Sequence, residues 1–596
     1  MHVLDWCLVV LIPALVIFDG VRHGKGAQNS LEDYFLAGRR VRWWAMGMSV
    51  MATQASAITM ISIAGHGYEH GLRWLHIYLA LPFAMVLLCA TVVPWFLRAR
   101  VFTAYEYLER RFDGTARTLA SILFLVSRGL AVGTSLYAPS VVLSVVVGLP
   151  QWIGILLMGG LSSAYTVWGG NAAVIFTDVK QMAVMIVGIL VSLFIAVQSL
   201  PADVGFGDAM ALAGAFRKLE AIHIAPNAEQ VFADKYNLLS ALLGGFFLFL
   251  GYFGADQSQV QRYLAGSSVN QSRISLMVSA FAKVPMQFLI LLLGTMIYVH
   301  YTFAPAPVFF REDALAQRLS DAAAAPDPAL AQEYSRLKDR HALASQERRD
   351  AAVAFLKARD SEEESSEAAR RLRESGARVA EVKGQGIELY RRTTGDRKDD
   401  GDFIFPFFFV NELPVGLLGL VIAAIFVAAM SSLDAQLNSL ATSSVMDLYV
   451  RAFRQPVPPA RVLRMSRFAT VFWGAFATAS AFFVGNLGPI IEVVNKIGSM
   501  FYGSLFGVFL LGWLCPRARG SLGWISLLCG FLCVMYVHFV VNAKEVIIDG
   551  RKCVRVEFLW YNLIGCLGVL LIGFALAYAK DGLRLWRARS PSRREP

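Results

Sequence analysis

Runs of about twenty apolar residues recur along almost the whole chain, and each is long enough to cross the roughly 30 Å hydrocarbon core of a bilayer. A segment in lipid must satisfy its own backbone hydrogen bonds, so such runs form helices. The chain of 596 residues is 56% hydrophobic and only 17% charged, which excludes an ordinary soluble multidomain protein. The sequence therefore predicts an all-α polytopic protein embedded in the lipid bilayer.

We expect about thirteen transmembrane helices from these runs. They begin near Met1, Trp43, Leu72, Arg117, Trp152, Ala172, Leu238, Ile274, Leu413, Phe468, Pro489, Leu522 and Leu559. Arginines gather in the odd-numbered connections and in the C-terminal tail. Because such residues mark the cytoplasmic side, we expect an outside N-terminus, a cytoplasmic C-terminus and a location in the inner membrane of the cell. The same bias explains the net charge of +11, so no nucleic-acid binding is expected.

A charged segment from Tyr301 to Phe403 interrupts the apolar pattern. Its Ala, Leu, Glu and Arg content favours helix, and its charges favour contact with solvent. We expect an outside helical hairpin. It either lengthens a loop, which we favour, or binds an unidentified partner.

Two spans that are far apart in sequence carry oxygen-bearing residues where lipid would favour Leu or Ile. The second span contains TQAS (residues 53–56), and the ninth contains the pair Ser431 and Ser432. A broken helix leaves carbonyl oxygens unsatisfied, and a bare cation can satisfy them. The alternative is a packing seam of small residues. Two such runs at similar membrane depth favour a shared site for a small, hard cation.

Two acids also lie within spans, where an ionisable residue costs roughly 2.5–3.5 kcal/mol at a helix centre. Asp178 is near the inner end of the sixth span, and Asp434 follows the serine pair. Either could hold a second cation or carry a proton. Either could instead cap a helix end or pair with Lys180.

Two bases lie within other spans. Arg128 is too deep to reach the interface, and its planar fork matches a carboxylate in two parallel hydrogen bonds. The alternative is an ion pair with an internal acid such as Asp256. Lys283 lies closer to the inner end of its span, which favours a structural role.

Taken together, five segments resemble the sodium:solute symporter family. They are YFLAGRRVRWWAMGMSVMATQASA, TAYEYLERRF, YTVWGGNAAVIFTDVKQ, DQSQVQRYLAG and AAMSSLDAQLNSLATSSVMDLY. The resemblance covers nearly the whole chain except the insert. It implies the leucine-transporter fold, in which two inverted five-helix repeats, here spans two to six and seven to eleven, surround a central site.

On this resemblance the chain divides into five parts. They are residues 1–41, an extra span and inside loop; 42–300, the first part of the transporter core; 301–404, the outside insert; 405–512, the second part of the core; and 513–596, extra spans and a basic tail.

The resemblance also implies the site residues. The sodium ligands would be Ala52, Ala55, Ala428, Ser431 and Ser432. Asp178 matches an acid of a second sodium site in some members, but two serines of that site are Asp434 and Ala435 here, which leaves the ion stoichiometry open. The substrate-binding residues would be Gln54, Ser56, Thr59, Tyr78, Arg128, Asp256, Gln257 and Lys283.

The expected function is secondary transport and not an enzymatic reaction, with Na⁺ as the coupling ion and a small organic solute as the cargo. We favour a solute with a carboxylate held by Arg128, such as a sialic acid or a monocarboxylate. A neutral sugar or polyol is the alternative, with Arg128 tied to Asp256. A transporter-like membrane sensor is a more distant alternative. The sequence contains no HExxH or nucleotide-binding loop that would favour an enzyme.

Overall fold

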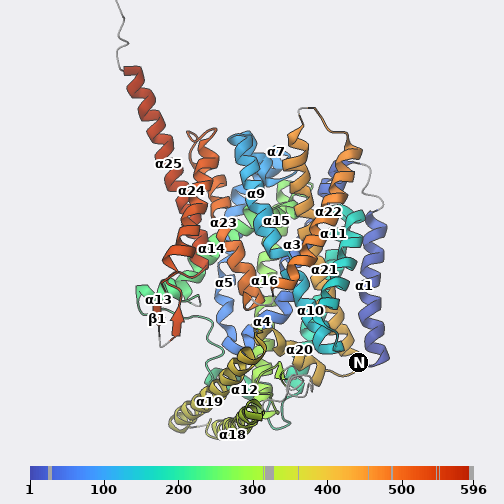
Figure 1. The fold of residues 1–596 in the computed structure, drawn as a ribbon, viewed down its shortest axis with the longest axis vertical. Helices are drawn as coiled ribbons and strands as arrows, with labels where there is room; N and C mark the ends of the chain where they lie inside the picture. The colour runs from blue at the N-terminus through green and yellow to red at the C-terminus, as the bar shows by residue number, and fades with distance from the viewer. Residues whose placement is uncertain are drawn as a thin grey trace, which may run out of the picture.

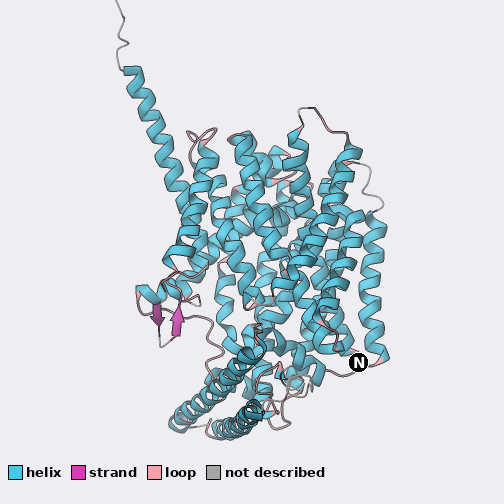
Figure 2. Ribbon diagram, viewed as in Figure 1, coloured by secondary structure: helices cyan, strands magenta, loops and turns pink. Residues whose placement is uncertain are grey.

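Helices make up nearly all of the structure, a computed structural model (Figures 1 and 2). It describes residues 1–24, 30–235, 237–312, 315, 328–359, 361–396, 398–453, 455–484, 487–544, 546–548 and 551–589. One hairpin of two short strands, β1 (Val546–Ile548) and β2 (Arg551–Cys553), lies within this part. The prediction of an all-α membrane protein is confirmed. The end of the basic tail, residues 590–596, lies outside the described residues.

The bundle is built from long helices and from helices divided into short segments. In chain order these are α1 (Val3–Gly24), α3 (Trp43–Gln54), α4 (Ala57–His70), α5 (Leu75–Leu79), α6 (Leu81–Ala90), α7 (Val92–Ala99), α9 (Gly114–Val132), α10 (Thr134–Val147), α11 (Gln151–Gln198), α14 (Gly245–Ala255), α15 (Gln257–Leu264), α16 (Val269–Phe303), α21 (Leu417–Ser443), α22 (Pro459–Val484), α23 (Ile490–Leu514), α24 (Leu522–Tyr536) and α25 (Leu559–Arg589). Shorter helices are α2 (Leu31–Leu36), α8 (Ala104–Arg111), α12 (Phe206–Ala215), α13 (Ala228–Ala233) and α20 (Gly401–Glu412).

Within the described residues, ten helical stretches are long and apolar enough to cross a membrane, and Ser240–Ala255 is a shorter apolar helix. The predicted count of about thirteen spans is therefore not established. The difference falls on the predicted spans near Trp43, Trp152 and Leu238. They lie in helices that are broken or continuous with a neighbour, as the next two features show.

Two helices break near the middle of the bundle. After α3, Ala55 leaves the helical conformation, with φ −93° and ψ 97°. Ser56 then caps α4, because its side chain accepts a hydrogen bond from Ile58 N while Thr59 Oγ1 accepts one from Ser56 N. Asp256 ends α14 in the same way and caps α15 by accepting from Ser258 N. Each break leaves helix ends, and therefore free backbone groups, inside the protein.

The chain reverses within α11 at Gly170, whose φ of 57° and ψ of −170° are not helical. A Cβ atom there would lie 2.9 Å from Tyr34 O, so only glycine fits this turn. The reversal is also visible in the contacts, because Thr166 bonds to Asp434 while Asp178 bonds to Ser431. Two residues twelve apart on α11 thus reach two residues three apart on α21, which a continuous helix could not do.

Extra helices flank this core on both sides (Figure 1). α1 packs against α11 and α21, and α25 packs against α23 and α24. The Asp5 carboxylate of α1 accepts hydrogen bonds from Gly416 N and Gly419 N, at 2.7 and 3.0 Å, and so caps the first turn of α21. α1 therefore supports the helix that carries the serine pair.

The charged segment forms a hairpin of two long helices, α18 (Pro328–Lys357) and α19 (Glu362–Thr394). It lies beside α12 and α20 at the end of the bundle that also holds the N-terminus, and α25 extends from the opposite end (Figure 1). We call the first of these the hairpin end. That this end faces outside stays a prediction, as do the five sequence divisions.

Candidate functional site

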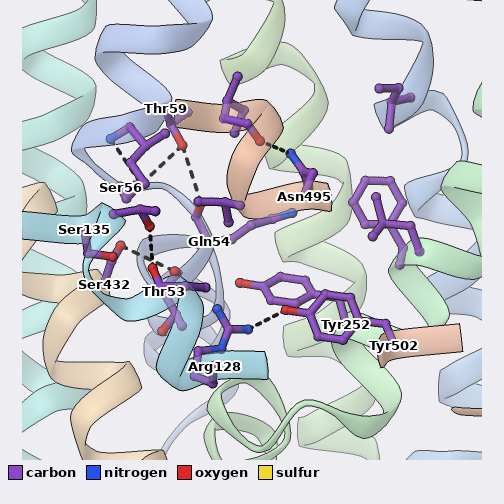
Figure 3. A pocket seen from close by; sticks show the side chains of 18 of the residues that line it. Thr53, Gln54, Ser56, Thr59, Arg128, Ser135, Tyr252, Ser432, Asn495 and Tyr502 are labelled. Carbon is purple, nitrogen blue, oxygen red and sulfur yellow. Dashed lines mark hydrogen bonds between the residues drawn. The ribbon is translucent and has the colours of Figure 1, made fainter. Parts of the chain in front are cut away.

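A cavity lies at the centre of the bundle, beside the break between α3 and α4 (Figure 3). Five predicted substrate residues line it: Gln54, Ser56, Thr59, Tyr78 and Arg128. The other polar side chains that line it are Thr53, Thr134, Ser135, Tyr252, Ser432, Gln436, Asn495 and Tyr502. Apolar and aromatic residues such as Trp74 and Phe249 complete the wall. Such a mixture suits a small polar solute with an apolar face.

Arg128 enters the cavity from α9 and is only 4% exposed. Its Nη2 donates hydrogen bonds to Asp256 Oδ2 and, at 2.7 Å, to Tyr502 Oη. Its guanidinium carbon also lies 5.5 Å from the centre of the Tyr252 ring. Nε is buried and has no hydrogen-bond acceptor among the described residues, so the guanidinium keeps unused donor capacity.

Asp256 is not part of the cavity wall. Its Oδ1 accepts from Ser258 N and Ser258 Oγ, at 2.8 and 2.6 Å, while its Oδ2 accepts from Arg128. The same carboxylate thus caps α15 and fixes the direction of Arg128. The ion pair between Arg128 and Asp256, one of our two alternatives, is present, and it leaves part of the guanidinium open.

Two further predicted substrate residues lie away from the cavity wall. Gln257 joins α15 to the segment before α8, because it accepts from Ala104 N and donates to Phe102 O. Lys283 is fully buried on α16, with its Nζ 5.9 Å from the ring centre of Tyr78. Its Nζ has no hydrogen-bond partner among the described residues.

Ser432, one of the predicted sodium ligands, lies against the end of α3. Ser432 Oγ lies 3.5 Å from Ala52 O and 3.4 Å from Thr53 O, both of which it approaches as a donor. Ala55 is the extended residue that follows α3, and Ala428 lies one helical turn before Ser432 on α21. Carbonyl and hydroxyl oxygens are the ligands that a hard cation prefers.

Both acids are fully buried, Asp178 against α21 and Asp434 on it. Asp178 accepts from Ser431 Oγ at 2.6 Å and from Ser49 Oγ at 2.5 Å, whereas Lys180 pairs with Asp19 of α1. Asp434 lies in the middle of α21 and not at a helix end.

Asp434 has fewer hydrogen-bond partners than Asp178. Asp434 Oδ1 accepts from Thr166 Oγ1 at 2.8 Å, and the same hydroxyl lies 2.7 Å from Ser162 O. Asp434 Oδ2 has no hydrogen-bond partner among the described residues. A carboxyl group buried in this way needs a proton or a cation beside it.

Sequence reasoning missed several residues of the wall. Gln436 donates from Nε2 to Ser135 Oγ at 2.9 Å, and Asn495 and Tyr502 come from α23. Gln436 and Asn495 were detectable, since each is a polar residue with other polar residues nearby inside a predicted span. Tyr502 gave no such signal, because a tyrosine in a span is ordinarily part of the packing.

A family model described as "SSF: Sodium:solute symporter family" matches residues 34–331 and 377–530. The sodium/glucose cotransporter of Vibrio parahaemolyticus is 25% identical over 534 residues, covering 87% of this chain and 82% of the cotransporter. The sodium/sialic acid symporter SiaT of Proteus mirabilis is 24% identical over 568 residues, covering 94% and 92%.

A solved structure of a Na⁺-coupled sialic acid symporter, in a substrate-bound outward-open state, resembles this chain with a TM-score of 0.72. The match covers 97% of this chain and 98% of the other, at 22% sequence identity. At this identity the likeness shows that the two chains share a fold. The predicted leucine-transporter architecture agrees with it.

Proposed function

We propose, since the chain belongs to the sodium:solute symporter family, that it imports a small organic solute together with sodium by alternating access. The observation that carries the proposal is the approach of Ser432 to the carbonyl oxygens at the end of α3. A cation held there would connect the broken helix to α21. Cation binding would then stabilise the conformation in which the end of α3 and the serine pair of α21 both contact the cation.

We further propose that the solute carries a carboxylate bound by Arg128. The support is that Arg128 lines the cavity and that only Nη2 donates to Asp256 and Tyr502, while Nε has no acceptor among the described residues. A planar carboxylate in the cavity could accept two guanidinium donors at once. The competing proposal is a neutral sugar or polyol, and it rests on the fact that Asp256 already neutralises the charge of Arg128.

A thermal-shift screen on the purified full chain would test both proposals. The probes are N-acetylneuraminic acid, lactate, glucose and galactose, each in sodium chloride and in potassium chloride. We expect an acid to raise the unfolding temperature only when sodium is present, because a ligand stabilises the state that it binds. Stabilisation by a sugar alone would favour the competing proposal.

Two variants separate the cation from the solute. The double variant Ser431→Ala, Ser432→Ala should lose the response to sodium itself. Ser439→Ala is its matched control, since Ser439 is equally buried on α21 but donates only to Gln436 O of its own helix. Arg128→Gln should lose the response to the acid and keep the response to sodium. A double serine variant that still responds to sodium would contradict the proposed sodium site.

A further inference from the structure

Four carboxylates from two elements gather at the hairpin end of the bundle. We call Glu69 of α4 and Asp399, Asp400 and Asp402 at the start of α20 the outer acid cluster. A Cβ atom at Gly401 would lie 2.7 Å from Asp399 Oδ2 and 3.3 Å from Glu69 Oε2, so both carboxylates face one point. Like charges brought this close oppose one another.

The cluster lies where three helices of the transport pathway meet. Asp402 accepts hydrogen bonds from Ser62 Oγ of α4 and, at 3.4 Å, from Ile490 N at the start of α23. The backbones of α4 and α20 also touch, because a Cβ atom at Gly65 would lie 2.3 Å from Gly401 O. α4 carries Ser56 and Thr59 of the cavity wall. The cluster therefore holds the far end of a helix whose first turn forms part of the cavity wall.

The hairpin supplies the cation of this cluster. Lys383 of α19 places its Nζ 2.9 Å from Asp400 Oδ2 and 3.5 Å from Glu69 Oε1. The same Nζ lies over the rings of Tyr68 and Phe310, at 5.5 and 5.1 Å. Lys383 thus ties the hairpin to both α4 and α20.

Other charged or titratable groups around the cluster are His66 and His70 of α4, Lys218 beside it, Arg348 on α18, and Glu492, paired with Lys235, on α23. Lys218 donates to Tyr68 O and Glu69 O, so it belongs to the end of α4 itself. Arg348 donates to Tyr301 O. Lys383 is therefore the lysine that bridges the two groups of carboxylates.

We propose that the hairpin forms part of a gate at the hairpin end of the bundle, where Lys383 joins it to α4 and α20. Protons bound by the outer acid cluster strengthen this contact. The proposal goes beyond solute transport and does not depend on which solute is carried. Under this proposal the inserted segment does more than lengthen a loop, and its role does not depend on an unidentified partner.

The pKa shifts determine whether the contact between the hairpin and the core weakens or strengthens as the pH rises. Burial, Glu69 and Asp400 together raise the pKa of Asp399 to about 7, and burial and Asp399 raise the pKa of Asp402 well above its ordinary value. Asp399 is therefore protonated in this arrangement below about pH 7. The contact is strongest there and weakens as the pH rises through 7, because an open arrangement would bind fewer protons.

Hydrogen exchange on the full chain in lipid nanodiscs tests the proposal without any solute. The measurement is the protection of Gly401–Glu412 at pH 6 and pH 8, corrected for intrinsic exchange. From a pKa near 7 we expect protection to fall by about tenfold over this interval. Asp399→Asn should keep its protection at pH 8, since it has no proton to lose there. Lys383→Met should lose protection at both values.

The matched control is Glu374→Gln, because Glu374 is an exposed acid of α19 that pairs with Arg370 of its own helix. It should show the wild-type loss of protection. Glu69→Gln, from the other side of the cluster, should flatten the pH response as Asp399→Asn does, and it replaces that variant if Asp399→Asn does not fold. Equal wild-type protection at pH 6 and pH 8, or an unchanged loss in the Asp399 or Glu69 variant, would overturn the proposal.

Discussion

Ser431 Oγ donates a hydrogen bond of 2.6 Å to Asp178 Oδ1, and this bond joins α21 to the second half of α11. The other oxygen of Asp178 accepts from Ser49 Oγ of α3. One buried carboxylate thus fixes three helices around the end of the broken helix. Asp178 both orients a predicted sodium ligand and adds a negative charge close to it.

We expect Asp178→Asn to weaken sodium binding by at least about tenfold, which corresponds to roughly 1.4 kcal/mol. The variant loses the negative charge beside Ser431, and its amide nitrogen can only donate to a hydroxyl, so one of the two serine hydrogen bonds must reverse its direction. The measurement is the sodium concentration that gives half of the maximal thermal stabilisation. Ser192→Ala is the control, since this buried hydroxyl of α11 donates only to Gly188 O of its own helix. An unchanged midpoint in Asp178→Asn would leave Asp178 a purely structural role.

The broken helix and the serine pair could be predicted because polar atoms are costly in lipid. TQAS and Ser431–Ser432 each stand out against apolar neighbours, and the structure brings them together. The sequence also predicted that a new span begins near Ala172, and the chain reverses nearby, at Gly170. Such patterns can be recognised in the sequence without knowing which helices are neighbours in the fold.

The direction of single side chains could not be predicted in the same way. A helix that is apolar on all sides has no polar face to fix its rotation. Lys283, on the apolar helix α16, was expected at the cavity from the resemblance and lies away from its wall, and so does Gln257 at the start of the polar helix α15. The sequence likewise did not decide whether Arg128 pairs with Asp256 or with a solute carboxylate. The contact between Lys383 and Asp400 joins a surface helix to the core, and no local pattern indicates it.

α4 and α16 approach so closely that Gly294 can be tested as a packing residue. A Cβ atom there would lie 1.9 Å from Ala64 O and 2.8 Å from Tyr68 N. We expect Gly294→Ala to force the helices apart and to lower the unfolding temperature markedly, at a cost of about 1–3 kcal/mol or more. Gly160→Ala is the control, because a Cβ atom there meets nothing within 4 Å. Equal unfolding temperatures for the two variants would contradict this packing.

Asp5 offers a test of the support that α1 gives to α21. We expect Asp5→Ala to destabilise the protein by about 0.5–2 kcal/mol, because Gly416 N and Gly419 N lose their acceptor. The midpoint of the sodium response should not change, since the serine pair lies more than ten residues further along α21. Asn227→Ala removes the cap of the short helix α13 and serves as control, with a smaller effect on unfolding. A large shift of the sodium midpoint in Asp5→Ala would contradict a purely supporting role.

Asp256→Asn separates the two proposed classes of solute. The variant keeps a carbonyl oxygen to cap α15 at Ser258, but its amide nitrogen cannot accept from Arg128. The guanidinium is then buried without a counter-ion, which costs about 3–5 kcal/mol. We expect the variant to unfold at a lower temperature than the wild type when no ligand is present.

A carboxylate ligand supplies the counter-charge that the Asp256→Asn variant lacks. In sodium, N-acetylneuraminic acid or lactate should therefore raise its unfolding temperature by more than it raises that of the wild type, whereas glucose and galactose should not. The double variant Arg128→Gln, Asp256→Asn is the matched control, because it has no buried guanidinium for an acid to neutralise, and its extra response should disappear. If Asp256→Asn instead lost the response to every acid while a sugar still stabilised the wild type, Arg128 and Asp256 would together form a neutral wall, and the solute would be a sugar or polyol.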